Sequence, residues 1–212
     1  MKIDVSNFTY EKDNVRCTLE TYEWDNVWWE HAADDTNPRV LYIGDSISCA
    51  TRRVATAVSG GEIYFDGFGT SKALDNPYFC ESVTCFARQQ RRRDVIVFNN
   101  GLHGWHLEDE DEYAEHYEKM IRFLQSEFAG TPILLILTTH VKDPERDARV
   151  CVRNRIVCEL SRKYELGTVD FYKITNEKPH LLSSDGVHLS REGYELLANE
   201  LVECVRETIN LI

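Results

Sequence analysis

Short apolar segments alternate with longer amphipathic segments from residue 39 onward. Residues 39–43 and 132–137 are mostly apolar, and such short runs bounded by turn residues are typical of buried strands. Residues 109–128 instead place apolar side chains at helical spacing, which predicts an amphipathic helix. Along the chain, this pattern predicts strands at 39–43, 62–66, 94–98, 132–138 and 168–171, and helices at 47–58, 81–92, 109–128, 146–164 and 190–208.

Strands that alternate with helices form a parallel sheet with helices on both faces, because parallel strands need a long crossover connection. The predicted fold class is therefore α/β: a three-layer α/β/α domain with a doubly wound, flavodoxin-like parallel sheet of about five strands. Residues 70–80 and 172–184 do not fit the alternation. We expect them to be loops at one rim of the sheet, where substrate specificity is usually determined.

Residues capable of nucleophilic chemistry stand at this rim. Gly44-Asp45-Ser46 follows the first predicted strand, and Asp185-Gly186-Val187-His188 precedes the last predicted helix, which Ser190 is predicted to cap. A serine attacks an ester at neutral pH when an imidazole accepts its proton and a carboxylate holds that imidazole in the right tautomer. Either motif alone is common in turns and caps. Together, at one rim, they indicate a serine esterase.

From residue 39 to about residue 205, these motifs resemble those of the SGNH or GDSL hydrolases. The family nucleophile lies in Gly-Asp-Ser after the first strand, and the family Asp-x-x-His precedes the last helix. The resemblance implies an SGNH-hydrolase-like domain over residues 39–212. It also implies that Ser46 is the nucleophile, His188 the general base and Asp185 the residue that orients His188.

The family also builds an oxyanion hole from the serine N–H, a glycine after the second strand and an asparagine in Gly-x-Asn-Asp after the third. By this resemblance Ser46 and Gly69 supply two donors, with Gly67 as the alternative glycine. The third block differs, because Asn99-Asn100-Gly101-Leu102-His103 replaces the family pattern. A neutral imidazole can donate as an amide does, so His103 or Asn100 is predicted to complete the hole. This Gly-Leu-His variant resembles that of a subset of esterases acting on acylated carbohydrates.

Other residues near the motifs are candidates for substrate binding. Arg52 and Arg53 follow the nucleophile by about two helical turns and are candidates to contact an acidic substrate. Trp105, beside the third block, is predicted to line the substrate pocket. The remaining basic cluster, Arg88 with Arg91–Arg93, closes a predicted helix, where cations offset the negative end of the helix dipole.

A metal site is an alternative interpretation of His103 and His106, which acidic residues at 108–112 follow. Zinc sites usually have a third or fourth ligand at recognisable spacing, and acidic residues in the first turn of a helix have a simpler role at its positive end. We therefore expect no metal and no cofactor. The seven cysteines lack the Cys-x-x-Cys spacing of zinc or redox sites, and we expect reduced thiols.

The first 38 residues lie outside the resemblance and are rich in aromatic side chains. We expect residues 1–38 to form an aromatic strap packed on the domain. Such aromatic side chains also stack on sugar rings or form dimer contacts, and alternation over residues 18–24 suggests a strand. The aromatic residues are Phe8, Tyr10, Tyr22, Trp24, Trp28 and Trp29.

Charge and hydropathy restrict the partners. A formal net charge of −12 argues against a nucleic acid or an anionic membrane as a partner. The apolar run at 132–137 is far too short to span a bilayer. Residues 1–6 lack the apolar core of a secretory signal, and reduced cysteines favour a cytoplasmic location. A secreted or periplasmic protein whose signal had been removed would have the same sequence.

The predicted activity is hydrolysis of a small acyl ester, acetyl above all, on a carbohydrate or glycoside. The small acyl group is expected because the sequence offers no long apolar segment for a lipid tunnel and no lid. Two alternatives remain open: a carbohydrate O-acyltransferase, and a non-catalytic carbohydrate-binding protein on the same fold. The sequence leaves the sugar, the regiochemistry and the oligomeric state open.

Overall fold

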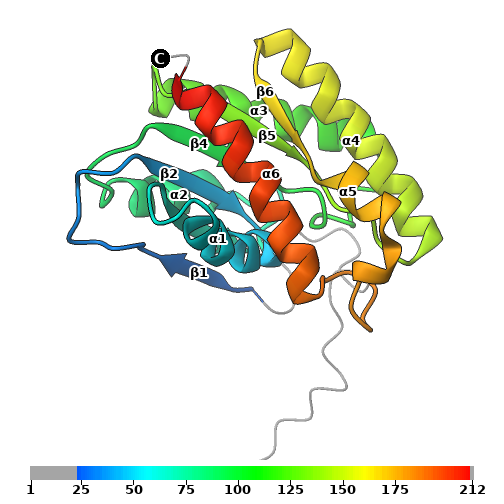
Figure 1. Ribbon diagram of the computed structural model, residues 1–212. Helices are drawn as coiled ribbons and strands as arrows, with labels where there is room; N and C mark the ends of the chain where they lie inside the picture. Colours follow the sequence, from blue (N-terminus) through cyan, green and yellow to red (C-terminus); the bar gives the residue numbers. More distant parts are fainter. Residues whose placement is uncertain (1–22, 211–212) are drawn as a thin grey trace, which may run out of the picture.

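Six strands form one sheet in the order β1-β3-β2-β4-β5-β6 in the computed structural model, which describes residues 23–210 (Figure 1). The strands β2 to β6 run parallel to one another in the order of a flavodoxin-like doubly wound sheet. The predicted α/β/α fold class is confirmed. The strands are β1 (Asp25–Trp28), β2 (Arg39–Gly44), β3 (Tyr64–Thr70), β4 (Val95–Phe98), β5 (Ile133–Leu137) and β6 (Gly167–Asp170).

Strand β1 is an additional, antiparallel strand that the sequence pattern does not predict. It pairs with Gly67–Thr70 of β3 at the edge of the sheet, and all four of its residues are exposed. An exposed strand shows no alternation of buried and exposed positions, so the hydrophobic pattern carries no signal for it. Of the strand expected at 18–24, residues 18–22 lie outside the described residues.

Helices cover both faces of the sheet. Figure 1 shows α1 and α6 in front of the sheet and α3 and α4 behind it. Residues of α5 belong to the core on the side of α1 and α6, whereas residues of α2 share the other core with α3 and part of α4. The helices are α1 (Ser46–Val58), α2 (Phe79–Ala87), α3 (Glu110–Glu127), α4 (Pro144–Tyr164), α5 (Phe171–Glu177) and α6 (Arg191–Asn210).

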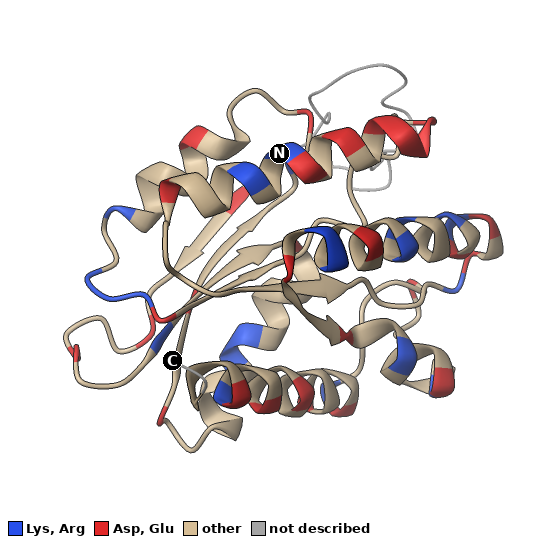
Figure 2. Ribbon diagram, turned by 90° about the horizontal axis from the view of Figure 1, so that it is seen from above, with Lys and Arg blue, Asp and Glu red and all other residues tan. Residues whose placement is uncertain are grey.

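The central strands are buried on both faces, and their successive side chains enter two separate apolar cores. In β2, Val40 and Tyr42 belong to the core beneath α1 and α6, whereas Leu41 and Ile43 belong to the core beneath α2 and α3. Each fully buried aliphatic side chain contributes about 1.5–3 kcal/mol. Figure 2 shows the strands almost free of charged residues, while acidic and basic residues lie along the helices. The sheet is thus a rigid support for the loops at its ends.

Several element boundaries differ from the prediction. Helix α2 ends at Ala87 instead of residue 92. The Arg93 guanidinium donates to the Ala87 carbonyl at 2.9 Å, as expected for a cation near a helix C-terminus. Strand β3 continues to Thr70. The expected loop at 172–184 contains most of α5 and the 3₁₀ turn η3 (Pro179–Leu181). Both are too short to show a helical period in the sequence.

Arg52 is buried, which differs from the expectation that it contacts substrate. Its side chain is 1 % exposed, and its guanidinium donates to the side chain of Asn26 in β1. Gly67 in β3 leaves room for it, because a Cβ there would lie 2.2 Å from the Arg52 side chain. Arg52 therefore links α1 to the edge strand. Arg53 is exposed, with its guanidinium 4.9 Å from the centre of the Trp28 ring.

The aromatic N-terminal segment is described only from residue 23. Within it, Trp29 stacks on Phe86 of α2 with ring centroids 4.2 Å apart. Phe8, Tyr10 and Tyr22 lie outside the described residues, so the strap over residues 1–38 stays a prediction.

The described part of the chain contains no helix long and apolar enough to cross a bilayer. Its cysteines are free thiols. They are Cys49, Cys80, Cys85, Cys151, Cys158 and Cys204.

Candidate active site

Ser46 begins helix α1 directly after strand β2. Gly44 leaves room for this turn, because a Cβ there would lie 2.7 Å from Ser48 Cβ. Asp45 is the N-cap of α1, and its Oδ1 accepts a hydrogen bond from the Ile47 N–H at 2.9 Å. Ser46 is therefore in the first turn of a helix, where backbone N–H groups have no intrahelical acceptor and the helix dipole is positive.

The Asp185 carboxylate closes the loop that carries His188. Its Oδ1 accepts hydrogen bonds from the Ser183 hydroxyl at 2.8 Å and from the N–H groups of Val187 and His188 at 2.9 Å each. The Ser183 N–H also donates to the His188 carbonyl at 2.7 Å. These bonds fix the two side chains of the Asp-x-x-His motif relative to each other.

Gly186 shapes this loop and joins it to the loop that follows β5. Its φ of +75° lies in the left-handed region, and a Cβ there would lie 2.7 Å from Lys142 Cβ. The Lys142 N–H donates to the Gly186 carbonyl at 2.7 Å. At the other end, Ser190 Oγ accepts from the Gly193 N–H at 3.2 Å, which is the predicted cap of α6.

The structure brings Ser46, Asp185 and His188 together. His188 Nδ1 lies 2.8 Å from Asp185 Oδ2, and His188 Nε2 lies 2.8 Å from Ser46 Oγ. The packing of α6 beside α1 brings together Ser46 and His188, which are 142 residues apart in the sequence (Figure 1). In this arrangement the hydroxyl can donate to a neutral imidazole whose other nitrogen donates to the carboxylate.

The Asp185 carboxyl group remains ionised in mildly acidic solution. Burial alone would raise its pKa, but the hydrogen bonds from Val187, His188 and Ser183 together outweigh burial and lower the pKa well below its ordinary value. The side chain is 52 % exposed, so solvent screens its charge and its contribution to stability is small. A negative charge is therefore present beside the imidazole at neutral pH.

Asn100 and His103, the predicted side-chain donors to an oxyanion, lie on the loop that follows β4. Asn100 is fully buried, its Nδ2 donates to the Lys72 carbonyl at 2.8 Å, and its Oδ1 has no partner within the described residues. His103 is 8 % exposed. Since β4 lies beside β2 and runs parallel to it, both residues follow the carboxyl end of their strand on the same side of the sheet as Ser46. Their roles as donors stay predictions.

Gly69 lies within β3 and not after it. It pairs with Gly44 of β2 and with Asn26 of β1. A Cβ at this position would lie 2.1 Å from Cys49 Sγ, so the absence of a side chain lets α1 pack directly on the strand. This packing is a structural reason for the glycine, and its role as an oxyanion donor stays a prediction.

Buried polar residues behind Ser46 form a network that the motifs do not indicate. Asn99 Nδ2 lies 3.5 Å from Asp45 Oδ2, and Asn99 Oδ1 accepts from the Thr138 hydroxyl at 2.6 Å. Asn154 Oδ1 accepts from the Thr138 N–H at 2.7 Å. The network supports the turn that presents Ser46. Its signal in the sequence is the position of two polar residues at strand ends: Asn99 directly follows the predicted strand 94–98, and Thr138 is the last residue of the predicted strand 132–138.

His106 pairs with an aspartate. Its Nε2 lies 2.9 Å from Asp75 Oδ2, and the two side chains are 5 % and 9 % exposed. Between residues 23 and 210, no group of three or more His, Cys, Asp or Glu side chains is arranged to hold a metal ion. The acidic residues that follow begin α3, with Asp109 as its N-cap and Glu110, Asp111 and Glu112 in its first turn, as predicted.

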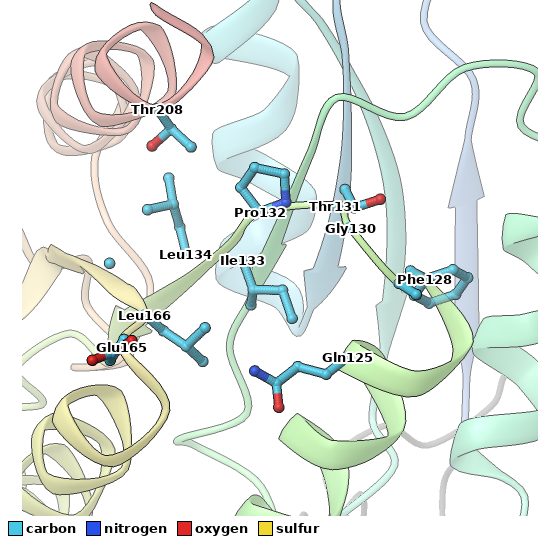
Figure 3. Close-up of a pocket in the computed structure, with 12 residues that line it drawn as sticks. Gln125, Phe128, Gly130, Thr131, Pro132, Ile133, Leu134, Glu165, Leu166 and Thr208 are labelled. Atoms are coloured by element: carbon cyan, nitrogen blue, oxygen red, sulfur yellow. The ribbon is translucent and has the colours of Figure 1, made fainter. Parts of the chain in front are cut away.

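A hollow of about 630 Å³ lies at the amino-terminal ends of β5 and β6 (Figure 3). It is bounded by the end of α3 and by the starts of β5 and β6, with apolar residues such as Phe128, Pro132 and Leu166 in its wall. Ser46 instead follows the carboxyl end of β2. The hollow is therefore separate from the candidate active site.

Comparisons with known proteins find solved structures of similar fold. No protein-family model and no curated protein sequence matches the chain. An acetyl xylan esterase is 20 % identical, with a TM-score of 0.61 over 79 % of this chain and 99 % of that one. A lipolytic protein of the G-D-S-L family from Veillonella parvula is 18 % identical, with a TM-score of 0.63 over 78 % of this chain and 96 % of that one.

The C-terminal catalytic domain of peptidoglycan O-acetyltransferase A from Streptococcus pneumoniae is 14 % identical, with a TM-score of 0.63 over 82 % of this chain and 96 % of that one. At such identities the similarity concerns the fold. Together with the sheet order, it shows that the chain has the SGNH/GDSL hydrolase fold.

Proposed function

We propose that the protein is a serine esterase that removes small acyl groups, acetyl above all, from a carbohydrate or glycoside through an acyl-serine intermediate. The observation that carries this proposal is the pair of contacts made by His188. Its Nε2 lies 2.8 Å from Ser46 Oγ and its Nδ1 lies 2.8 Å from Asp185 Oδ2. Both distances are within the hydrogen-bond reach that activation of a serine by a general base requires.

In the proposed reaction, Ser46 Oγ attacks the ester carbonyl carbon while His188 Nε2 accepts the hydroxyl proton. The tetrahedral intermediate breaks down when the imidazolium returns this proton to the leaving alcohol oxygen, and the acyl group stays on Ser46. His188 then accepts a proton from a water molecule whose oxygen attacks the acyl carbon. As the bond to Ser46 Oγ breaks, the imidazolium returns this proton to Ser46 Oγ and the carboxylic acid leaves. Asp185 stays ionised throughout and keeps the Nδ1–H of His188 directed toward itself.

The negative charge that develops on the carbonyl oxygen requires hydrogen-bond donors. The N–H of Ser46 lies at the positive end of α1, which favours this charge. Asn100 or His103 is the proposed side-chain donor, and Gly69 is the proposed backbone donor. Removal of one such donor typically lowers turnover by about 10²–10³-fold.

Support for a carbohydrate ester comes from two of the compared proteins. One is an acetyl xylan esterase and another is a peptidoglycan O-acetyltransferase. In this chain, Trp105 is partly buried on the loop after β4 and is the proposed aromatic wall of the substrate pocket.

Ser46 is expected to react covalently with a fluorophosphonate probe, because His188 Nε2 lies 2.8 Å from Ser46 Oγ and can accept its proton. Mass spectrometry of the native protein and of Ser46→Ala should locate the adduct and show its loss. Ser48→Ala is a matched control, since Ser48 lies in the same helix turn but its hydroxyl donates to the Asp45 carbonyl at 2.7 Å. Native protein that stays unlabelled beside a reactive reference esterase would contradict the proposal and favour the non-catalytic alternative.

Acetyl esters are expected to be better substrates than long acyl esters, because the sequence offers no long apolar segment for a lipid tunnel. The measurement is kcat/KM for p-nitrophenyl esters from acetate to octanoate. Faster cleavage of the octanoate than of the acetate would contradict the small acyl group while leaving the nucleophile in place.

Transfer of the acyl group to a sugar hydroxyl is a second candidate function, because one compared structure is an O-acetyltransferase. The same acyl-serine serves both reactions, which differ in whether water or a hydroxyl group attacks it. Products formed from an acetyl donor with and without a sugar acceptor separate them. Free acetate in both reactions supports the hydrolase, and an acetylated acceptor supports the transferase.

A further inference from the structure

A buried arginine of α4 holds the backbone of the loop that carries Asn100 and His103. The guanidinium of Arg153 is 0 % exposed and donates to the carbonyls of three residues in this loop. The carbonyls belong to Gly101 at 3.2 Å, His103 at 2.7 Å and Gly104 at 2.8 Å. The peptide planes that follow Asn100 are thus turned toward α4.

Arg149, one helix turn earlier, extends this contact. It donates to the carbonyls of Trp105 at 3.0 Å and Leu107 at 2.5 Å. The Glu110 carboxylate of α3 pairs with both arginines, at 2.6 Å with Arg149 and 2.9 Å with Arg153. Arg153 therefore holds the first part of the loop and Arg149 its second part, while Glu110 pairs with both guanidinium groups.

Packing removes further freedom from the same loop. A Cβ on Gly101 would lie 1.8 Å from Thr138 Oγ1, and Gly104 has a φ of +71°. The Tyr113 hydroxyl donates to the Asn100 carbonyl at 3.0 Å. The Arg153 guanidinium also lies over the rings of Tyr113 and Trp105.

Stability alone does not explain an arginine at position 153. Burying a charge is unfavourable, and well-packed apolar residues of similar volume often replace a buried ion pair without loss of stability. What a guanidinium adds is a rigid planar set of five donors, which fixes the relative positions of the groups it binds. Here those groups are the backbone on either side of His103.

We propose that Arg153, assisted by Arg149, is a positioning residue that sets the backbone of residues 100–104 so that the side-chain donor on this loop meets the oxyanion formed at Ser46. This inference rests on the proposed function. Rotation of the loop would break several hydrogen bonds to a buried cation. The donor is therefore held in place, and a misplacement of about 1 Å can lower turnover by about 100-fold.

Arg39 is a matched control for Arg153. Its side chain is 4 % exposed and pairs with Asp66 at 2.8 Å. It also donates to the carbonyls of Glu30, His31 and Asp34. Like Arg153, it is buried, and it has the same kinds of partner, a carboxylate and three backbone carbonyls. However, it is the first residue of β2, whereas Ser46 follows the other end of that strand.

The experiment compares Arg153→Met, Arg149→Met and Arg39→Met by denaturant unfolding and by p-nitrophenyl acetate kinetics, at a temperature where each variant is folded. Arg153→Met and Arg39→Met are both expected to unfold at lower denaturant concentration. Only Arg153→Met is expected to lose kcat, by about 100-fold, with a much smaller change in KM. Arg149→Met should lose less kcat, and it tests the same loop if Arg153→Met does not fold.

Hydrogen exchange measured by mass spectrometry provides a second readout. Residues 99–107 should exchange faster in Arg153→Met but not in Arg39→Met. The inference is overturned if Arg153→Met and Arg149→Met fold and keep the native kcat, or if their kcat equals that of Arg39→Met. When the native protein is labelled by a fluorophosphonate, such a result leaves the proposed function in place. A native protein that is neither labelled nor active would overturn the proposed function, and this inference with it.

Discussion

A His188→Ala variant is expected to hydrolyse p-nitrophenyl acetate about a millionfold more slowly than the native protein. Without the imidazole 2.8 Å from Ser46 Oγ, the serine hydroxyl keeps its proton and the leaving alcohol receives none. The measurement is kcat at saturating substrate after subtraction of spontaneous hydrolysis. KM should change far less, because the ring acts mainly in the transition state.

His140 offers a control from the same edge of the sheet. It follows β5, its Nδ1 lies 2.8 Å from Asp147 Oδ1, and its side chain is 19 % exposed. The Nδ1–carboxylate distance in this pair equals that of Asp185–His188. Within residues 23–210, the His140 ring contacts no serine hydroxyl. His140→Ala should keep most of the native turnover. Equal losses in the two variants would contradict the specific role of His188.

An Asp185→Asn variant is expected to lower kcat by about 10⁴-fold while the protein stays folded. The asparagine oxygen can still accept from the N–H groups of Val187 and His188, so the loop should keep its shape. Its amide nitrogen then faces His188 Nδ1 and favours the tautomer with the proton on Nε2. That tautomer cannot accept the proton of Ser46. The measurement is kcat, beside the free energy of unfolding.

Asp147→Asn is the matched control, because Asp147 holds His140 in the same way and should be dispensable for turnover. The free energy of unfolding should fall by at most about 1 kcal/mol in Asp185→Asn, since the carboxylate is half exposed. The pKa of Asp185 is lowered in the native state, so its ionised form stabilises the fold above about pH 4 and this contribution is lost as pH falls through the native value. Native turnover in Asp185→Asn would contradict its orienting role.

The fold and the meeting of Ser46, Asp185 and His188 could be predicted because both follow from strand order. Aliphatic runs such as 132–137 identify buried parallel strands, and parallel strands end at a common edge. A motif at the end of the first strand and another before the last helix therefore come together. The roles of these residues and of Asn100 and His103 depend on chemistry that the experiments above test.

Other features could not be predicted, because they depend on side-chain direction. Arg52 follows Ser46 by six residues, so the two side chains point about 120° apart around the axis of the helix. The short separation in sequence therefore suggested a substrate contact that the buried side chain does not make available. Strand β1 is exposed and shows no buried face. Arg153 lies among other charged residues of α4, and the sequence does not distinguish this buried cation from a solvated one.

The closed loop from Ser183 to His188 also has an entropic consequence. Its carboxylate and backbone hydrogen bonds are made entirely within the protein, so the order of the imidazole is established when the chain folds. Ordering one residue costs roughly 1–2 kcal/mol of backbone entropy. A loop already organised in this way adds no such term to the activation barrier, and substrate binding energy remains available for aligning the ester carbonyl.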